Sequence, residues 1–269
     1  MPTADSRQPT LQSLLRLAFM GCGLLAVGSC NEISSPLRGD IYGRSIIVED
    51  VVTQDTVIDG VSYEMGEMVT DTVDFAWRAG DLPIKVWVHD SAGLPADFRA
   101  AVTAWQGVLV FGEVAVQYVS DSSTAQIIVV LGSPPPAPGA PTGAVAIRLQ
   151  SAPAACEGAT DIQVSAPDHT KLWTPIRIYM TPKYLLSDPE TKACLRRATI
   201  HELGHALGLF KHSPDSLDIM FPFPRVDSPS DADAATIQFL YHQTPDLRAR
   251  PATDTIPGVP FMSVPGVTR

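Results

Sequence analysis

The sequence predicts an α+β fold in which a twisted mixed sheet of about five strands packs against helices. Residues 84–88 alternate between apolar and polar, and an apolar stripe at helical spacing follows over residues 98–109. Two further helices are predicted from capping signals, which are Asp188 before Pro189 and the segment Ser228-Pro229-Ser230-Asp231. The remaining strand patterns lie at residues 113–119, 126–131, 142–149 and 176–180.

Each element has a local reason. The run at residues 126–131 is apolar throughout, as in a strand that is buried on both faces. Phe98, Val102 and Trp105 share one helical face, which predicts core packing. The helix that begins after Asp188 is expected to end near Gly208, because glycine readily adopts the positive φ of a helix exit.

Composition and charge narrow the function classes. The chain has 269 residues, of which 45% are hydrophobic, so it can form one substantial domain with extensions. A formal net charge of −10 argues against nucleic acid or an anionic membrane surface as the partner. The 24 prolines indicate long irregular connections between the elements. We expect a monomer.

Metal-binding chemistry concentrates in the segment 201–212. His201 and His205 are four residues apart, so on a helix both imidazoles reach the same ion. Glu202 lies beside the first histidine, where it can take a proton from a metal-bound water. The chain leaves the helix at Gly208, and His212 can then supply a third ligand, which leaves a fourth position for water.

This segment, together with the downstream Asp218-Ile219-Met220-Phe221-Pro222, resembles the metzincin zinc endopeptidases, and among them the matrixins. The resemblance spans residues 81–243 and implies a zincin-like fold with an active-site helix, a methionine turn and a C-terminal helix. It implies Zn²⁺ as the cofactor and Glu202 as the general base. The implied zinc ligands are His201, His205 and His212, with Met220 as the turn methionine.

The sequence departs from the family motif at the third ligand. The family's histidine falls at the position of Lys211, and His212 comes one residue later. A one-residue bulge would bring His212 inward, whereas a charged lysine amine is a poor ligand. The carboxylates of Asp215 and Asp218 are the alternative third ligands, because zinc also accepts oxygen donors.

The resemblance implies a zinc-dependent endopeptidase that acts on proteins or peptides. The substrate would extend along an edge strand, for which residues 142–149 are the candidate, and Phe221 and Pro222 would line the pocket for the residue after the cut. An alternative is a membrane-anchored, zinc-containing binding protein with little or no proteolytic activity. A zinc hydrolase of other amides is a third interpretation.

Two features of related enzymes have no counterpart in the pattern. The cysteine motif with which matrixin propeptides block their zinc does not occur, so latency by that device is not expected. Asp161, Asp168 and His169 lie in a long loop that is predicted after residue 150, but their spacing does not match the family's structural ion sites. We therefore assign no structural calcium or second zinc to them.

The N-terminus predicts export. Arg7 and Arg16 precede the apolar run 17–27, which is too short to span a bilayer comfortably. The run ends in Val27-Gly28-Ser29-Cys30, which resembles the lipobox of bacterial lipoproteins. The resemblance implies cleavage before Cys30 and a lipid anchor on it, at the outer membrane or cell surface. An ordinary secretory signal or an uncleaved anchor is the alternative.

The expected organisation has four parts: a signal peptide (1–29), a tether or added hairpin (30–80), the catalytic domain (81–243) and a proline-rich tail (244–269). Asp59-Gly60 is the hairpin signal in the second part. With Cys22 in the signal and Cys30 lipidated, Cys156 and Cys194 remain as a pair. In an oxidising compartment they favour a disulfide, and two buried free thiols are the alternative.

Overall fold

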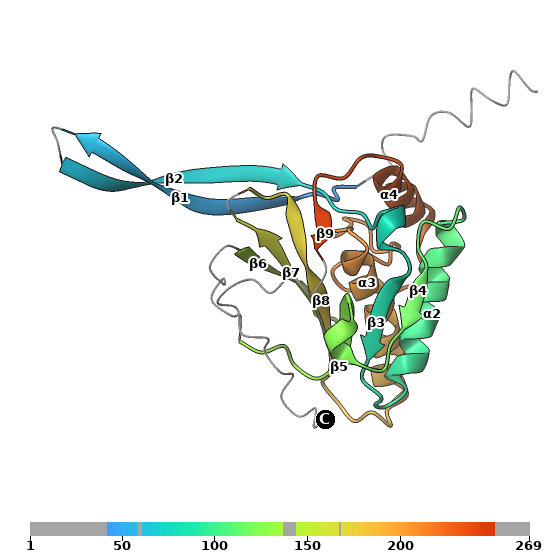
Figure 1. Cartoon of the computed structure of the whole chain (residues 1–269). Coiled ribbons are helices and arrows are strands. Elements are labelled where there is room, and N and C mark those ends of the chain that lie inside the picture. The colour runs from blue at the N-terminus through green and yellow to red at the C-terminus, as the bar shows by residue number, and fades with distance from the viewer. Residues whose placement is uncertain (1–41, 59–60, 137–143, 167, 251–269) are drawn as a thin grey trace, which may run out of the picture. The chain divides into compact units, whose positions relative to one another are not determined.

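The computed structural model describes residues 42–58, 61–136, 144–166 and 168–250. The predicted signal peptide, Cys30, the Asp59-Gly60 dipeptide of the predicted hairpin and residues 251–269 of the predicted tail lie outside these ranges. Within them the chain is α+β, as predicted, and is built on a seven-stranded sheet of order β4-β3-β5-β8-β7-β6, with β9 beside β8 (Figure 1). The sheet is mixed: β3, β4, β5, β8 and β9 pair in parallel, whereas β6 and β7 are antiparallel.

The strands of this sheet are β3 (Ile84–Val88), β4 (Val116–Tyr118), β5 (Ile127–Leu131), β6 (Ala144–Ser151), β7 (Cys156–Ser165), β8 (Lys171–Pro182) and β9 (Arg248–Arg250). The α-helices are α2 (Leu94–Val108), α3 (Pro189–Ala206) and α4 (Asp231–Tyr241), and short 3-10 turns occur at Ala79–Asp81 and Ser122–Thr124. A separate antiparallel hairpin pairs β1 (Ile46–Ile58) with β2 (Val61–Val73).

The strand count differs from the prediction of about five because two strands were missed. The segment predicted to be a long loop contains β7, which pairs with both β6 and β8. The inward positions of β7 include Gly158 and Thr160, so its buried face carries too little apolar side chain to show a clear alternation. The second missed strand is β9, in the segment predicted to be a tail; its three residues pair with the start of β8.

The core is formed where α2 and α3 cover one face of the sheet (Figure 1). As predicted, β5 is buried on both faces: Ile127 and Val129 belong to the core under the helices, while Ile128 and Val130 belong to a smaller cluster on the other face. The two helices are also joined directly, because the Trp105 indole donates a hydrogen bond of 2.9 Å to the carbonyl of Ile200.

Residues at both ends of the described chain join this core. Ile46, Val48 and Val73, where the hairpin begins and ends, are buried, and so is Leu247 just before β9. No helix among the described residues is both long enough and apolar enough to cross a membrane.

A disulfide joins β7 to α3. Cys156 is the first residue of β7, and its sulfur bonds to Cys194 in the second turn of α3, 38 residues further along the chain. Both cysteines are buried in the core. The cross-link therefore ties the helix that carries the paired histidines to the strand beneath it.

Removing this cross-link should lower stability. Closing a loop of 38 residues in the unfolded chain is worth about 4 kcal/mol in the chain-entropy account of disulfides. We expect the Cys156→Ser/Cys194→Ser variant to lose about 2–4 kcal/mol of unfolding free energy, measured by urea denaturation. Reductant should destabilise the wild-type protein to a similar extent and leave the variant unchanged. Equal stability of variant and wild type would contradict a stabilising role for the bond.

Candidate metal centre

The site is built at the C-terminal end of α3. The Asp188 carboxylate caps the start of this helix by accepting a hydrogen bond of 2.8 Å from the main-chain N–H of Thr191. The helix ends at Ala206, and Gly208 follows with φ +110°. A Cβ on Gly208 would overlap the carbonyl oxygen of Phe75, so glycine is required both for the turn and for this close approach.

Three imidazoles converge just beyond this turn. One nitrogen each from His201, His205 and His212 lies within 4.8 Å of the other two. His201 and His205 extend from adjacent turns of α3 and are fully buried, whereas His212 comes from the following loop and is partly exposed. The Nε2 atoms of His205 and His212 are 3.2 Å apart. The structure thus brings together the three histidines that the motif singled out.

Hydrogen bonds set which nitrogen of each buried ring is free. The Nδ1 atom of His201 lies 2.7 Å from the carbonyl oxygen of Ile219, and that of His205 lies 2.6 Å from the carbonyl oxygen of Leu209. Because a carbonyl only accepts, each Nδ1 carries the proton and each Nε2 keeps its lone pair. Burial lowers the pKa of His201 to about 3 and the pKa of His205 well below its usual value, so both rings are neutral at pH 7.

The cluster fits zinc. Nitrogens bound to one tetrahedral zinc lie roughly 3.3 Å apart, close to the separation of the His205 and His212 Nε2 atoms. The Nε2 atom of His201 is buried and has no hydrogen-bond partner among the described residues, as expected of a nitrogen reserved for a ligand. In metal-binding histidines, the ring nitrogen that does not bind the metal usually donates a hydrogen bond, as each Nδ1 does here to a carbonyl.

The alternative third ligands lie elsewhere. Lys211 and Asp215 are exposed. Asp218 is buried, but its two carboxylate oxygens accept hydrogen bonds from the hydroxyls of Ser213 and Ser230. Asp218 therefore braces the loop that follows His212, and the histidine nitrogens are the donors that meet at one point.

Glu202 is fully buried and lies against the sheet. Its Oε1 accepts a hydrogen bond of 2.6 Å from the hydroxyl of Ser151, and its Oε2 accepts one of 2.8 Å from the hydroxyl of Thr160. Burial raises the pKa of Glu202 to about 8, and the two hydroxyl donors oppose that rise. The motif had indicated the glutamate; the two hydroxyl partners had no local signal, because they are 51 and 42 residues away in the chain.

A methionine lies directly beneath the histidine helix. Met220 is fully buried, and a Cβ on Gly204 would overlap its sulfur, so the glycine between the two histidines admits the methionine. The turn is held by the Asp233 carboxylate, which accepts hydrogen bonds of 2.7 Å and 3.4 Å from the main-chain N–H groups of Ile219 and Met220. Tyr42 donates a further bond of 2.8 Å to Asp233.

The predicted pocket residues follow this turn. Phe221 and Pro222 are partly buried, and the ring of Phe221 lies 6.0 Å from that of Phe223, which is half exposed. Leu217, on the other side of the methionine, is largely exposed. Apolar side chains therefore lie on both sides of Met220 at the surface.

The polar residues that the sequence analysis considered for structural ion sites have other partners. Asp161 forms a two-pronged ion pair with Arg148, Asp168 accepts a hydrogen bond from Ser165, and His169 lies 2.7 Å from the carboxylate of Asp71. Among the described residues, the histidine triad is the one group of three or more potential ligands that converges on a point.

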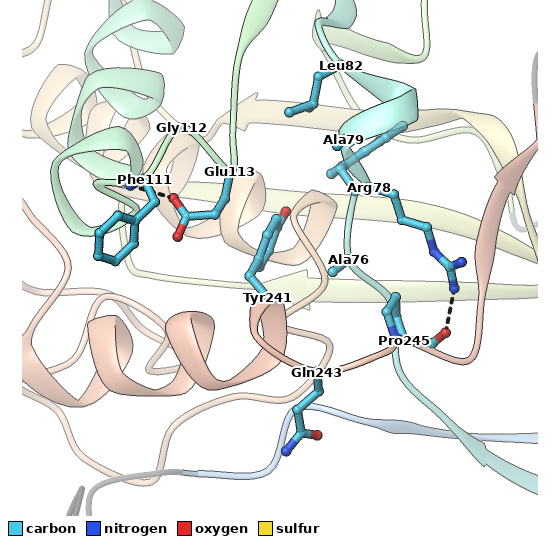
Figure 2. A pocket seen from close by; sticks show the side chains of 11 residues that line it. Ala76, Arg78, Ala79, Leu82, Phe111, Gly112, Glu113, Tyr241, Gln243 and Pro245 are labelled. Atoms are coloured by element: carbon cyan, nitrogen blue, oxygen red, sulfur yellow. Dashed lines mark hydrogen bonds between the residues drawn. The ribbon is translucent and has the colours of Figure 1, made fainter. Parts of the chain in front are cut away.

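A cavity of about 290 Å³ lies apart from this centre (Figure 2). Within the described part of the chain, its lining includes no predicted site residue. Figure 2 shows two of its internal bonds, from Arg78 to the carbonyl of Pro245 and from the main-chain N–H of Phe111 to Glu113. The lining residues are Ala76, Trp77, Arg78, Ala79, Leu82, Phe111, Gly112, Glu113, Tyr241, Gln243 and Pro245.

A mixed sheet, a helix with paired histidines and a buried methionine turn together define the metzincin class of metallopeptidase folds. The model of the Matrixin peptidase family matches residues 90–242, which is more than half of the chain, so the chain belongs to the matrixin family. Matrixins bind zinc and cleave proteins. A search of curated proteins gave no match.

Replacing the third histidine should remove the metal. We expect wild-type protein to bind one zinc ion per chain and His212→Ala to lose at least about 100-fold in zinc affinity, because two imidazoles alone make a weak site. Inductively coupled plasma mass spectrometry after dialysis against a competing chelator measures both. Lys211→Ala and Asp215→Ala are matched controls that should keep full occupancy. Zinc retained by His212→Ala but lost from Asp215→Ala would assign the third ligand to the carboxylate.

Proposed function

We propose that the protein is a zinc-dependent endopeptidase that hydrolyses peptide bonds with Glu202 as the general base. The observation that carries the proposal is the convergence of three imidazole nitrogens within 4.8 Å, with a glutamate directly after the first histidine. Family membership supports the same reaction class. The proposed ligands are His201, His205 and His212.

In the proposed hydrolysis, the metal ion and the residues of the chain have different roles. Bound zinc would supply Lewis acidity, which acidifies water and polarises a carbonyl. Glu202 accepts the proton of the attacking water and later returns it to the leaving amine. Burial raises the pKa of Glu202 and so makes its carboxylate a stronger base than one in water, which favours the first of these transfers. The buried methionine turn keeps the floor of the site apolar.

Substrate binding is proposed along the sheet. β6 is the last strand in the order of the described sheet, and no other described strand pairs with its outer edge, so the substrate would add there as a further strand. Its final residue, Ser151, contacts Glu202, which connects that edge to the base. Phe221 and Pro222 would line the pocket for the side chain after the cut, with a preference for an apolar residue there.

The second candidate function is a membrane-anchored, zinc-containing binding protein with little or no proteolysis. Two observations favour it. The third histidine is displaced by one position from the family motif, and both carboxylate oxygens of Glu202 are already engaged by hydroxyls. Stoichiometric zinc without chelator-sensitive cleavage of casein would support this candidate.

Replacing Glu202 by glutamine distinguishes the peptidase from the binding protein. The Glu202→Gln variant should keep zinc, because the ligands are unchanged, and should lose at least about 100-fold in cleavage of fluorescent casein, because the amide cannot accept the proton. Activity of the wild type should vanish with 1,10-phenanthroline and return with added zinc. A variant as active as wild type would overturn the role of Glu202.

We also propose that the protein is exported and anchored through a lipid on Cys30. The proposal is supported by the arginines and apolar run that precede Val27-Gly28-Ser29-Cys30. In a bacterial host, the wild-type chain should incorporate radiolabelled palmitate and enter the membrane fraction. Cys30→Ala should lose the label, while Cys22→Ala should keep it. Unlabelled wild-type protein in the soluble exported fraction would indicate an ordinary secretory signal instead.

A further inference from the structure

The carboxylate of Glu202 lies in a recess formed by two neighbouring strands. Ser151 is the last residue of β6, and Thr160 lies in the middle of β7; each gives its hydroxyl to a different carboxylate oxygen. Both hydroxyl-bearing residues are almost fully buried, with 1% and 0% of their surface exposed. Two donors from two strands fix both the position and the rotation of a carboxylate, whereas one donor would leave it free to turn.

A glycine provides the space for this arrangement. Gly158 lies opposite Ser151 in the β6–β7 register and two residues before Thr160. An added Cβ at Gly158 would lie 2.7 Å from Cγ and 2.8 Å from Cδ of Glu202, and would overlap its Oε1. The carboxylate thus occupies the volume that any other residue at 158 would fill.

The pairing of β7 with α3 sets the register of the recess. From Cys194 to Glu202 the helix rises about 12 Å, and from Cys156 to Thr160 the strand rises about 13 Å. The disulfide and the hydrogen bond between Thr160 and Glu202 therefore join the same helix to the same strand at two points that are about equally far apart on both elements. Each fixes the spacing at which the other forms.

The other strand is held in place from the opposite face. Arg148 on β6 donates bonds of 2.6 Å and 2.7 Å to the two carboxylate oxygens of Asp161 on β7. These residues are direct partners in the register and alternate with the inward-facing Thr160. A two-pronged pair of this kind fixes the strands against each other, so the end of β6 that carries Ser151 stays beside Glu202.

We propose that Ser151 and Thr160 are positioning residues that, in the space left by Gly158, orient the Glu202 carboxylate for proton transfer. The inference rests on the proposed peptidase function. It assigns the two hydroxyls a role that acts only through Glu202, and it explains why a glycine and two small polar residues occupy the inward face of β6 and β7.

Removing either hydroxyl should slow catalysis without weakening substrate binding. We expect Ser151→Ala and Thr160→Val each to lower kcat about tenfold, with KM on a fluorogenic peptide and zinc content unchanged, because a misoriented base loses part of its contribution. Thr160→Ser, which keeps the hydroxyl, should have a kcat much closer to that of the wild type than Thr160→Val has. Gly158→Ala should lower kcat at least as much. Thr181→Val on β8 and Gly80→Ala, whose Cβ would meet no atom within 4 Å, are the matched controls and should retain wild-type kcat.

The decisive measurement repeats the substitutions in Glu202→Gln. If the hydroxyls act through the carboxylate, Ser151→Ala and Thr160→Val cause no further loss in that background, whereas an effect on the fold alone would multiply with it. Thermal unfolding confirms that each variant is folded. Unchanged kcat in both hydroxyl variants, or the same tenfold loss in the Glu202→Gln background, would overturn the positioning role while leaving the peptidase function intact. Wild-type protein that binds zinc but cleaves nothing would overturn both.

Discussion

The centre depends on the direction of two buried lone pairs, which are those on the Nε2 atoms of His201 and His205. His201 and His205 can meet a common ion only if Nδ1 of each ring stays bonded to a carbonyl, and these carbonyls belong to Ile219 and Leu209. Both carbonyls lie beyond the helix, one in the exit loop and one in the methionine turn. The loop and the turn therefore have to be placed as accurately as the helix. Asp233 does this for the turn, because its buried carboxylate holds the main-chain N–H groups around Ile219 as well as that of Ser230 at the start of α4.

The support of the centre extends beyond the part of the chain that the family model matches. The family match begins at residue 90, yet Tyr42, Phe75 and Trp77, which precede it, contact segments around the histidines. The Tyr42 hydroxyl bonds to Asp233, the Trp77 indole donates to the carbonyl of Ala206 at 3.0 Å, and the carbonyl of Phe75 fills the space beside Gly208. These contacts reach the turn, the helix end and the helix exit respectively. Described residues that precede the matched range are thus packed against the segments that carry the histidines.

The features that were predicted from the sequence depend on residues close together in the chain, whereas the features that were missed depend on residues far apart in the chain. The cap at Asp188, the capping signature at residues 228–231, the helix end near Gly208 and the histidine pair all depend on residues within one or two turns. Each was found from local spacing. β7 was missed because Gly158 and Thr160 replace apolar residues on its inner face. Both residues lie against Glu202, since the glycine leaves room for its carboxylate and the threonine donates a hydrogen bond to it. These contacts join positions 42 or more residues apart. Since a partner so distant leaves no periodicity in the chain, only the folded structure shows why the pattern is broken there.

The same long-range packing explains how the chain accommodates its departure from the family motif. The residue added before the third histidine has to be absorbed between Gly208 and His212, and the main chain there is anchored by a hydrogen bond of 3.0 Å from Phe210 to the carbonyl of Arg44. Gly43 lies against the side chain of Lys211, where a Cβ would come within 3.0 Å of the lysine Cδ. Lys211 is thereby packed along the N-terminal segment and exposed to solvent, while the next residue turns inward to meet His205. A lysine at the family's histidine position is compatible with a three-histidine centre because the neighbouring N-terminal segment, rather than the metal, receives its side chain.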